Sequence, residues 1–229
     1  MLSLCNFMEK SMKILYETKN FAICQKDVGI VSQSTTDKKG LADIFEAEYG
    51  YSATINRLDT MVGGCVLFAK NKSTANILTQ MAEERQIDKE YILVCEGKLQ
   101  EKSGVFEDLL FKDSCKNKSY VVKRERKGVK RASLEYEVIG EREEDGKKFS
   151  LVKVKLHTGR THQIRVQFSS RKLPLCGDGK YGSKDNRCDV SLWSYKISFD
   201  IENENIKAVS LPPKDKYPWN LFNKELEIM

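Results

Sequence analysis

The stretch that decides the fold is Ala53-Thr54-Ile55-Asn56-Arg57-Leu58-Asp59, followed by Thr60-Met61-Val62, the pair Gly63-Gly64 and the apolar run Cys65-Val66-Leu67-Phe68-Ala69. The apolar run has the length and composition of a buried strand. The glycine pair allows a tight turn or a close approach to a ligand. A charged residue beside a buried strand costs free energy unless it is paired or used in chemistry. We therefore single out Asp59 as a candidate catalytic nucleophile.

Upstream and downstream of this stretch, hydrophobic periodicity predicts short strands and two helices. Strands are predicted at 14–16 and 21–24, joined by a turn at 18–20 and extended by 28–31. A helix should begin near 41, after possible caps at 35–37, and end at Gly50. A second helix is predicted over 71–86, with Ser73 as its cap and an apolar stripe of Ile77, Leu78, Met81 and Ala82.

In the second half, alternating residues predict strands at 91–95, 132–138, 152–156 and 193–199, with a charged turn at 141–147. A helix is predicted over 160–170, a shaped loop over 173–182 and a short helix at the C-terminus. Strands outnumber helices, and neighbouring strands are close in sequence. The fold class is therefore α+β, a mixed and largely antiparallel central sheet with flanking helices.

The chain of 229 residues is long enough for one large domain. We predict a single domain over 13–229, preceded by an N-terminal extension at 1–12 that can be disordered. The extension lacks the basic start and long apolar core of a signal peptide. Seven scattered cysteines without a C-x-x-C spacing indicate a reducing, cytoplasmic environment. Only two histidines are present, so a histidine-rich metal site is not expected.

Basic residues concentrate between 112 and 131, where we predict a mobile hairpin or loop. The net charge of +6 permits a polyanionic partner without requiring one. On its own the segment is slightly better explained as a solvated loop, but beside a catalytic site it would contact phosphates. The candidates for such contacts are Lys123, Arg124, Arg126, Lys127, Lys130 and Arg131.

Asp59, Tyr91 and His162 each have an ordinary structural explanation. Asp59 could belong to a buried ion pair that only joins two segments. Tyr91 could be a core aromatic with a satisfied hydroxyl, or a platform for an unstacked base. His162 could hydrogen-bond the backbone at the start of a helix. Residue type and spacing alone leave these alternatives open.

Five motifs, taken together, resemble the RluA family of RNA pseudouridine synthases. They are Asn56-Arg57-Leu58-Asp59 with Gly64, then Lys89-Glu90-Tyr91, then Thr158-Gly159-Arg160-Thr161-His162-Gln163-Ile164-Arg165-Val166, then Gly177-Asp178 and Tyr181-Gly182. Their order and spacing agree with the family, and the resemblance runs from about Lys13 to Pro213.

The resemblance implies a cleft across the middle of the sheet and isomerisation of a uridine within tRNA or ribosomal RNA, without cofactor or metal. Asp59 matches the catalytic aspartate, which would either attack the ribose or assist departure of the base. Tyr91 would pack on the flipped uracil and help remove a proton, and Arg160 would pair with the aspartate. Arg57 would lie near the gap left by the flipped nucleotide. We add Asn56, His162 and Arg165 as candidate RNA contacts, and expect a monomer that does not bind membranes.

The chain departs from the family at three places. Asn56 and Trp193 stand where histidine is usual, and Val62-Gly63 replaces a pair of hydroxyl residues. An alternative function is therefore an RNA-binding or RNA-folding protein that has lost catalysis. A hydrolase with an aspartate nucleophile would not explain the basic segment. The chain also begins too close to the catalytic motifs to hold the small RNA-binding domain of many family members.

Overall fold

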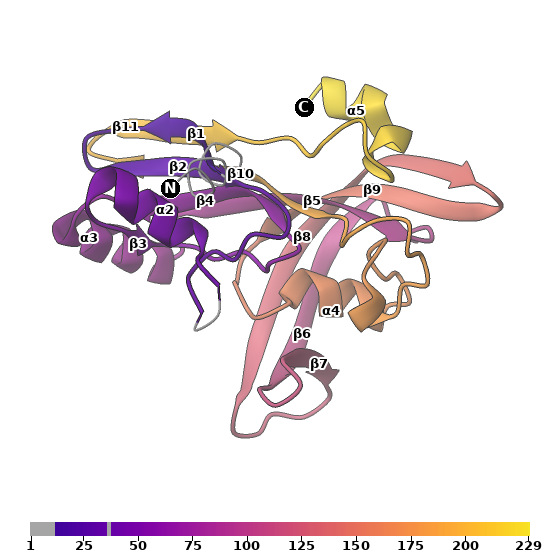
Figure 1. Cartoon of the computed structure of the whole chain (residues 1–229). Helices are drawn as coiled ribbons and strands as arrows, with labels where there is room; N and C mark the ends of the chain where they lie inside the picture. Colours follow the sequence, from indigo (N-terminus) through magenta and orange to yellow (C-terminus); the bar gives the residue numbers. More distant parts are fainter. Residues whose placement is uncertain (1–11, 36–37) are drawn as a thin grey trace. The chain divides into compact units, whose positions relative to one another are not determined.

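The computed structural model describes residues 12–35 and 38–229, which divide into two compact units. The first unit contains the chain up to Lys89 together with Trp193–Pro212, and the second contains Glu90–Leu192 and Pro213–Met229. Both consist of strands that are mostly antiparallel and carry few helices (Figure 1). The predicted α+β class is thus confirmed. The extension at 1–12 lies outside the described residues except for Met12, and the single domain over 13–229 stays a prediction.

In the first unit, β4 is the central strand and is buried at every position. It pairs antiparallel with β2 and β3 and parallel with β10, while β1 pairs with β2 and β11 with β10 in antiparallel fashion. The elements are β1 (Met12–Glu17), β2 (Phe21–Lys26), α2 (Leu41–Tyr49), β3 (Ala53–Thr54), β4 (Gly63–Ala69), α3 (Lys72–Glu83), β10 (Leu192–Ile201) and β11 (Glu204–Val209).

The predicted β1–β2 hairpin and both helices of this unit are confirmed, with differences at their ends. Helix α2 ends at Gly50, which adopts φ 75°. Helix α3 is capped by Asn71, whose side chain accepts a hydrogen bond from the backbone of Thr74, so the prediction of Ser73 as the cap was wrong. Ile77 also differs from the prediction, because 47% of it is exposed while Leu78 is buried.

Two further segments of this unit differ from the prediction. Residues 28–31 do not extend a strand, because Gly29 adopts φ 90° and the chain turns there. Strand β11 was missed because its sequence is charged and only Ile206 and Ala208 alternate into the core. Of the caps predicted at 35–37, residues 36–37 lie outside the described residues, and Gly40 precedes the helix.

In the second unit the strands follow the order β5-β9-β8-β6-β7, and every neighbouring pair is antiparallel. The turn predicted at 141–147 is tighter, since the two strands are joined by Asp145 and Gly146 alone. The elements are β5 (Asp88–Glu96), β6 (Ser103–Asp113), β7 (Lys118–Val122), β8 (Val129–Glu144), β9 (Lys147–Leu156), α4 (Gln163–Ser170), the 3-10 turns η1 (Gly179–Tyr181) and η2 (Trp219–Phe222), and α5 (Asn223–Glu227).

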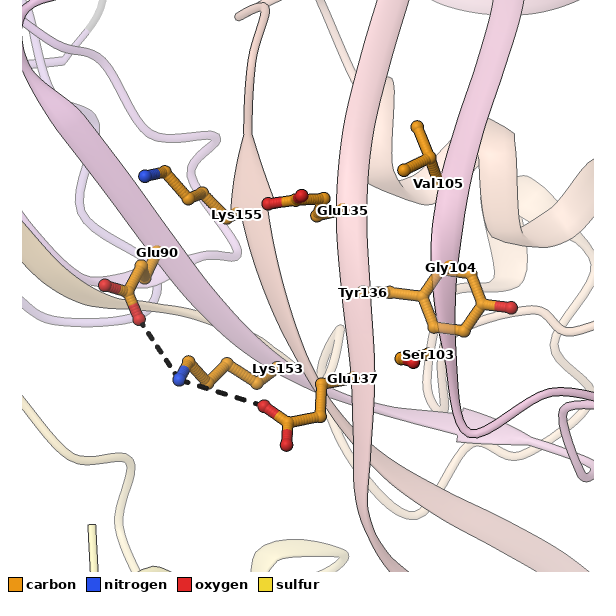
Figure 2. A pocket seen from close by; sticks show the side chains of 9 residues that line it. All are labelled: Glu90, Ser103, Gly104, Val105, Glu135, Tyr136, Glu137, Lys153 and Lys155. Carbon is orange, nitrogen blue, oxygen red and sulfur yellow. Dashed lines mark ion pairs between the residues drawn. The ribbon is translucent and has the colours of Figure 1, made fainter.

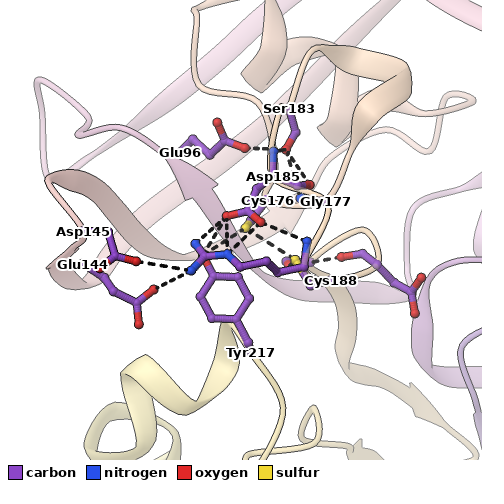
Figure 3. A network of polar contacts seen from close by, with 12 residues as sticks. Glu96, Glu144, Asp145, Cys176, Gly177, Ser183, Asp185, Cys188 and Tyr217 are labelled. Carbon is purple, nitrogen blue, oxygen red and sulfur yellow. Dashed lines mark hydrogen bonds and ion pairs between the residues drawn. The ribbon is translucent and has the colours of Figure 1, made fainter.

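The C-terminal segment of the second unit is attached through a polar network around Asp185 (Figure 3). The guanidinium of Arg187 donates to both carboxylate oxygens of Asp185, and the hydroxyl of Tyr217 donates to the same group at 2.8 Å. These bonds hold the pKa of the Asp185 carboxyl well below its usual range, with Arg187 as the main cause. Beside them the sulfurs of Cys176 and Cys188 lie 3.5 Å apart.

Candidate active site

Asp59 lies in the loop between β3 and β4, and the backbone on both sides of it is fixed. The hydroxyl of Ser32 accepts a hydrogen bond from the N–H of Leu58 and donates one to its carbonyl, both at 2.9 Å. After Asp59, the N–H of Val62 donates to the Asp59 carbonyl at 2.9 Å and closes a turn. The backbone that carries the Asp59 side chain is therefore held on both sides.

A buried lysine that sequence reasoning missed lies under this loop. Lys26 is 0% exposed, and its ammonium donates to the carbonyls of Ile30 at 2.7 Å, Asp27 at 3.0 Å and Thr60 at 3.3 Å. Burial lowers the pKa of Lys26 to about 8, although the negative charges of Asp59 and Asp27 oppose the shift. Lys26 therefore joins the turn at 27–30 to the nucleophile loop. The only signal in the sequence was a lysine two positions after the apolar run Phe21-Ala22-Ile23-Cys24.

Asn56 and Arg57, both predicted to contact RNA, are placed differently from each other. The amide of Asn56 donates to the carbonyl of Cys65 at 3.2 Å and accepts from the N–H of Leu67 at 2.7 Å. Asn56 thus supports β4 with both ends of its amide. Arg57 is exposed, so its guanidinium is accessible to a polyanion.

The departures at Gly63 and Trp193 are physically linked. These two residues are partners in the parallel pairing of β4 with β10. A Cβ added to Gly63 would lie 2.2 Å from ring carbon Cζ3 of Trp193, so the indole occupies the space of the missing side chain. The indole nitrogen donates to the hydroxyl of Ser210 at 3.1 Å. The indole ring of Trp193 therefore requires a glycine at position 63.

Tyr91 lies on β5 in the second unit and is 7% exposed. It is paired with Val154 of β9, which is paired in turn with Tyr136 of β8, so these three side chains share one face of the sheet. The ring of Tyr136 packs 6.4 Å from Phe168 of α4. Tyr91 therefore points to the face on which α4 packs.

Arg160 lies in the turn that leads from β9 into α4. The helix predicted over 160–170 begins only at Gln163, because His162 adopts φ 52° and the side chain of Gln163 organises the preceding turn. That amide accepts from Thr158 Oγ1 at 2.7 Å and from Arg160 N–H at 3.0 Å, and it donates to the carbonyl of Ser133 at 3.1 Å. Arg160 Nε donates to the carbonyl of Arg131 at 3.1 Å, which uses one of its five N–H groups.

His162 and Arg165 take part in internal contacts. His162 Nδ1 lies 2.9 Å from the hydroxyl of Tyr181, which also accepts from the N–H of Ser119 at 2.8 Å. The guanidinium of Arg165 is buried and binds both oxygens of Asp178, at 2.7 and 2.8 Å. This buried bidentate pair joins α4 to the loop that follows it, so Arg165 supports the fold of both segments.

The basic segment is a β-hairpin, β6–β7, followed by a loop at 123–128 and the start of β8. The six basic residues predicted to contact phosphates are all exposed. The prediction of a hairpin is confirmed. The prediction that it is mobile stays a prediction.

One hollow in the second unit is separate from these residues (Figure 2). Its volume is about 480 Å³, and Lys153 within it lies 3.6 Å from Glu90 and 4.0 Å from Glu137. Glu90 and Tyr91 are consecutive on β5 and so point to opposite faces. The hollow is lined by Glu90, Ser103, Gly104, Val105, Glu135, Tyr136, Glu137, Lys153 and Lys155, none of them a predicted site residue.

Asp59, Asn56 and Arg57 belong to the first unit, and Tyr91, Arg160 and the basic hairpin to the second. Within residues 12–35 and 38–229, no cluster of three or more metal-ligating side chains could hold a metal ion. No helix in the described part of the chain is long and apolar enough to cross a membrane.

Comparison with known proteins supports the family resemblance. A family model described as RNA pseudouridylate synthase matches residues 20–170, a range that contains Asp59, Tyr91 and Arg160. The chain is 30% identical over 221 residues to ribosomal large subunit pseudouridine synthase D of Borreliella burgdorferi, covering 88% of this chain and 65% of that protein. It is 28% identical over 183 residues to the dual-specificity RNA pseudouridine synthase RluA of Yersinia pestis, covering 79% and 86%.

The fold is also found in solved structures. Human RNA pseudouridylate synthase domain containing 1 matches with a TM-score of 0.76 at 21% identity, over 89% of this chain and 84% of that one. The chain spans 58–65% of the length of three of the relatives that it matches in sequence. Because the family model covers well over half of the sequence and the relatives include RluA-type enzymes, the chain belongs to the RluA-type family of RNA pseudouridylate synthases.

Proposed function

We propose that this protein is an RNA pseudouridine synthase that isomerises a uridine in tRNA or ribosomal RNA. The observation that carries the proposal is Asp59 on its doubly held loop, inside the segment matched by the family model. In the reaction the bond from uracil N1 to ribose C1′ breaks and a bond from C5 to C1′ forms. The proton on C5 is removed, and N1 gains a proton. No atom is added or lost, so the reaction consumes no second substrate.

Asp59 would act on the ribose, either by attacking C1′ or by assisting departure of the uracil. The bonds made by Ser32 and Val62 hold the backbone on both sides of Asp59, so little backbone reorganisation is needed as the glycosidic bond breaks. Tyr91 would pack against the uracil and help remove the C5 proton. Arg160 would pair with the carboxylate.

The uridine must leave its helix or loop before a side chain can reach the glycosidic bond, which costs about a few kcal/mol. Arg57 is exposed two residues before Asp59, and we propose that it occupies the gap left by the extruded nucleotide. The exposed cations of the basic hairpin would offset part of the cost by binding phosphates. We further propose that the protein works as a monomer in the cytoplasm. The free cysteines of the described residues fit such a reducing environment.

An RNA-binding protein without catalysis is the second candidate, motivated by the departures at Asn56, Val62 and Gly63. Their environment favours the enzyme. Asn56 supports β4 from within, and Gly63 accommodates Trp193, so these substitutions fit the structure around Asp59 without removing it.

A tritium-release assay separates the two candidates. Transcripts of tRNA and ribosomal RNA that carry tritium at uracil C5 are incubated with the wild type, with Asp59→Asn and with the control Asp215→Asn, which changes an exposed aspartate. If the protein is an enzyme, only the wild type and the control release tritium, while all three proteins bind RNA alike. Binding by the wild type without release from any transcript would support the non-catalytic candidate.

A further inference from the structure

The basic hairpin has two faces of different chemistry, and strand register defines them. Phe111 of β6 is opposite Tyr120 of β7 on one side and Val129 of β8 on the other. These three side chains therefore share one face, here called the outer face. Leu110 is opposite Val121 and so points to the other face.

The inner face is attached to the rest of the second unit. Leu110 and Val121 pack with Val166 and Tyr181. Ser119 adds two polar contacts, because its N–H donates to the hydroxyl of Tyr181 at 2.8 Å and its own hydroxyl donates to the carbonyl of Thr161 at 2.6 Å. The hairpin is thus fixed to the turn that carries Arg160, and the outer face has a defined position in this unit.

The outer face combines aromatic rings with cations. Tyr120 is 37% exposed, so its ring is accessible to a ligand. The guanidinium carbon of Arg126 lies 4.7 Å from the ring centre of Phe111, and the ammonium of Lys118 lies 5.8 Å from that of Tyr120. Between residues 112 and 131 the sequence carries nine basic and two acidic residues.

We propose that Tyr120, Phe111 and Arg126 form a stacking platform for unpaired nucleotides of the RNA substrate. Aromatic rings and guanidinium planes stack on bases that are not already stacked in a helix, whereas bases in an A-form duplex are inaccessible to them. The surrounding lysines and arginines supply the phosphate contacts. The substrate class is therefore RNA in which unpaired nucleotides flank the modified uridine, as in a stem–loop. This inference rests on the proposed function.

Binding of fluorescein-labelled RNA tests the platform without using activity. Two probes are compared by fluorescence anisotropy at one salt concentration, a stem–loop and a blunt duplex of equal length and nucleotide content. We expect the wild type to bind the stem–loop more tightly. Tyr120→Ala should weaken stem–loop binding by about 5- to 100-fold, the range for loss of one base stack, and should leave duplex binding unchanged.

Conservative variants separate stacking from charge. Tyr120→Phe keeps the ring and should bind within about twofold of the wild type. Arg126→Lys keeps the charge but loses the planar group, so it should lose part of the stem–loop preference. Tyr120→Ala should leave the slope of log K against log salt unchanged, since no phosphate contact is removed. Ile77→Ala, which truncates an exposed apolar side chain on α3, is the control for surface truncation.

Three results would overturn the platform. They are unchanged stem–loop binding by Tyr120→Ala, equal affinity of the wild type for both probes, and displacement of the RNA by polyglutamate at equal charge, which would indicate an acidic protein partner.

Tritium release is measured in parallel on the same variants. If Tyr120→Ala releases tritium with the KM of the wild type, the platform is rejected and the proposed enzymatic function is retained. If Tyr120→Ala loses stem–loop binding and neither the wild type nor any variant releases tritium, the proposed enzymatic function is rejected and the platform is retained.

Discussion

At the scale of the residue, Lys26 controls the nucleophile loop through three carbonyl contacts made in a fully buried position. Replacing it with methionine keeps most of its volume and leaves the carbonyl of Ile30 without its donor, while the carbonyl of Thr60 still accepts from the N–H of Gly29. We expect Lys26→Met to lower the free energy of unfolding by about 1–3 kcal/mol, the cost of one buried group left unsatisfied. Urea unfolding measures this loss. An unchanged unfolding midpoint would contradict the assigned role.

The lowered pKa of Lys26 also predicts a pH dependence with a definite sign. Between pH 8 and 10.5 the unfolded chain holds the Lys26 proton more tightly than the folded protein does, so the folded state is favoured as pH rises through that window. The free energy of unfolding of the wild type relative to Lys26→Met should therefore increase by up to about 3 kcal/mol from pH 7.5 to 10. Urea titrations of both proteins at four pH values measure the difference. A difference that falls with pH would show that the native pKa is not lowered.

Gly63 and Trp193 form a second pair of residues on which stability depends, because the indole of Trp193 fills the position of the side chain that Gly63 lacks. Gly63→Ala should destabilise the protein by roughly 1–3 kcal/mol through overpacking. In a Trp193→Leu background the same change should cost less, with a coupling of at least about 1 kcal/mol. A double-mutant cycle by urea unfolding measures the coupling. Additive effects would mean that the two residues do not compete for space.

At the scale of the element, the β6–β7 hairpin is placed by the hydroxyl of Tyr181, which accepts from Ser119 and contacts His162. Tyr181→Phe keeps the ring but leaves the buried N–H of Ser119 without its acceptor. The expected cost is about 1–3 kcal/mol in stability, together with a raised KM for RNA and a kcat close to that of the wild type.

Steady-state kinetics and thermal unfolding of Tyr181→Phe check this prediction. Lys184→Ala, three positions later and exposed, is the control and should leave stability within about 0.5 kcal/mol. An equal fall of kcat and kcat/KM in Tyr181→Phe, with KM unchanged, would place Tyr181 in the chemical step instead of in hairpin placement.

At the scale of the whole molecule, the strands that alternate regularly and the helices with a clear apolar stripe could be predicted from the sequence. The turn at 28–31 could not be predicted. It is held by the buried ammonium of Lys26, which also donates to the carbonyl of Thr60, a residue distant in sequence. The start of α4 at Gln163 depends likewise on an amide that bonds to Ser133, thirty residues earlier. Strand β11 is set by its pairing with β10, which outweighs its polar composition.

The candidate site shows the same division between local and distant information. Asp59, Tyr91 and Arg160 were identified from motifs, and Arg57 is exposed as an RNA contact would be. The burial of Arg165 against Asp178 and the use of Asn56 inside β4 were not visible, because both depend on partners brought close by folding. Motifs thus locate the candidate chemistry, while the structure distinguishes residues that face solvent from residues that support the fold.

Nucleoside analysis of the RNA product tests the central claim most directly. A transcript that releases tritium is incubated with the wild type or with Asp59→Asn, digested to nucleosides and quantified by liquid chromatography and mass spectrometry. The account predicts that the wild type converts uridine into an equal amount of a carbon-linked isomer of the same mass. Asp59→Asn should bind the RNA with unchanged affinity and form no isomer. Isomer formation by Asp59→Asn at the wild-type rate would contradict the assignment of Asp59 as the catalytic residue.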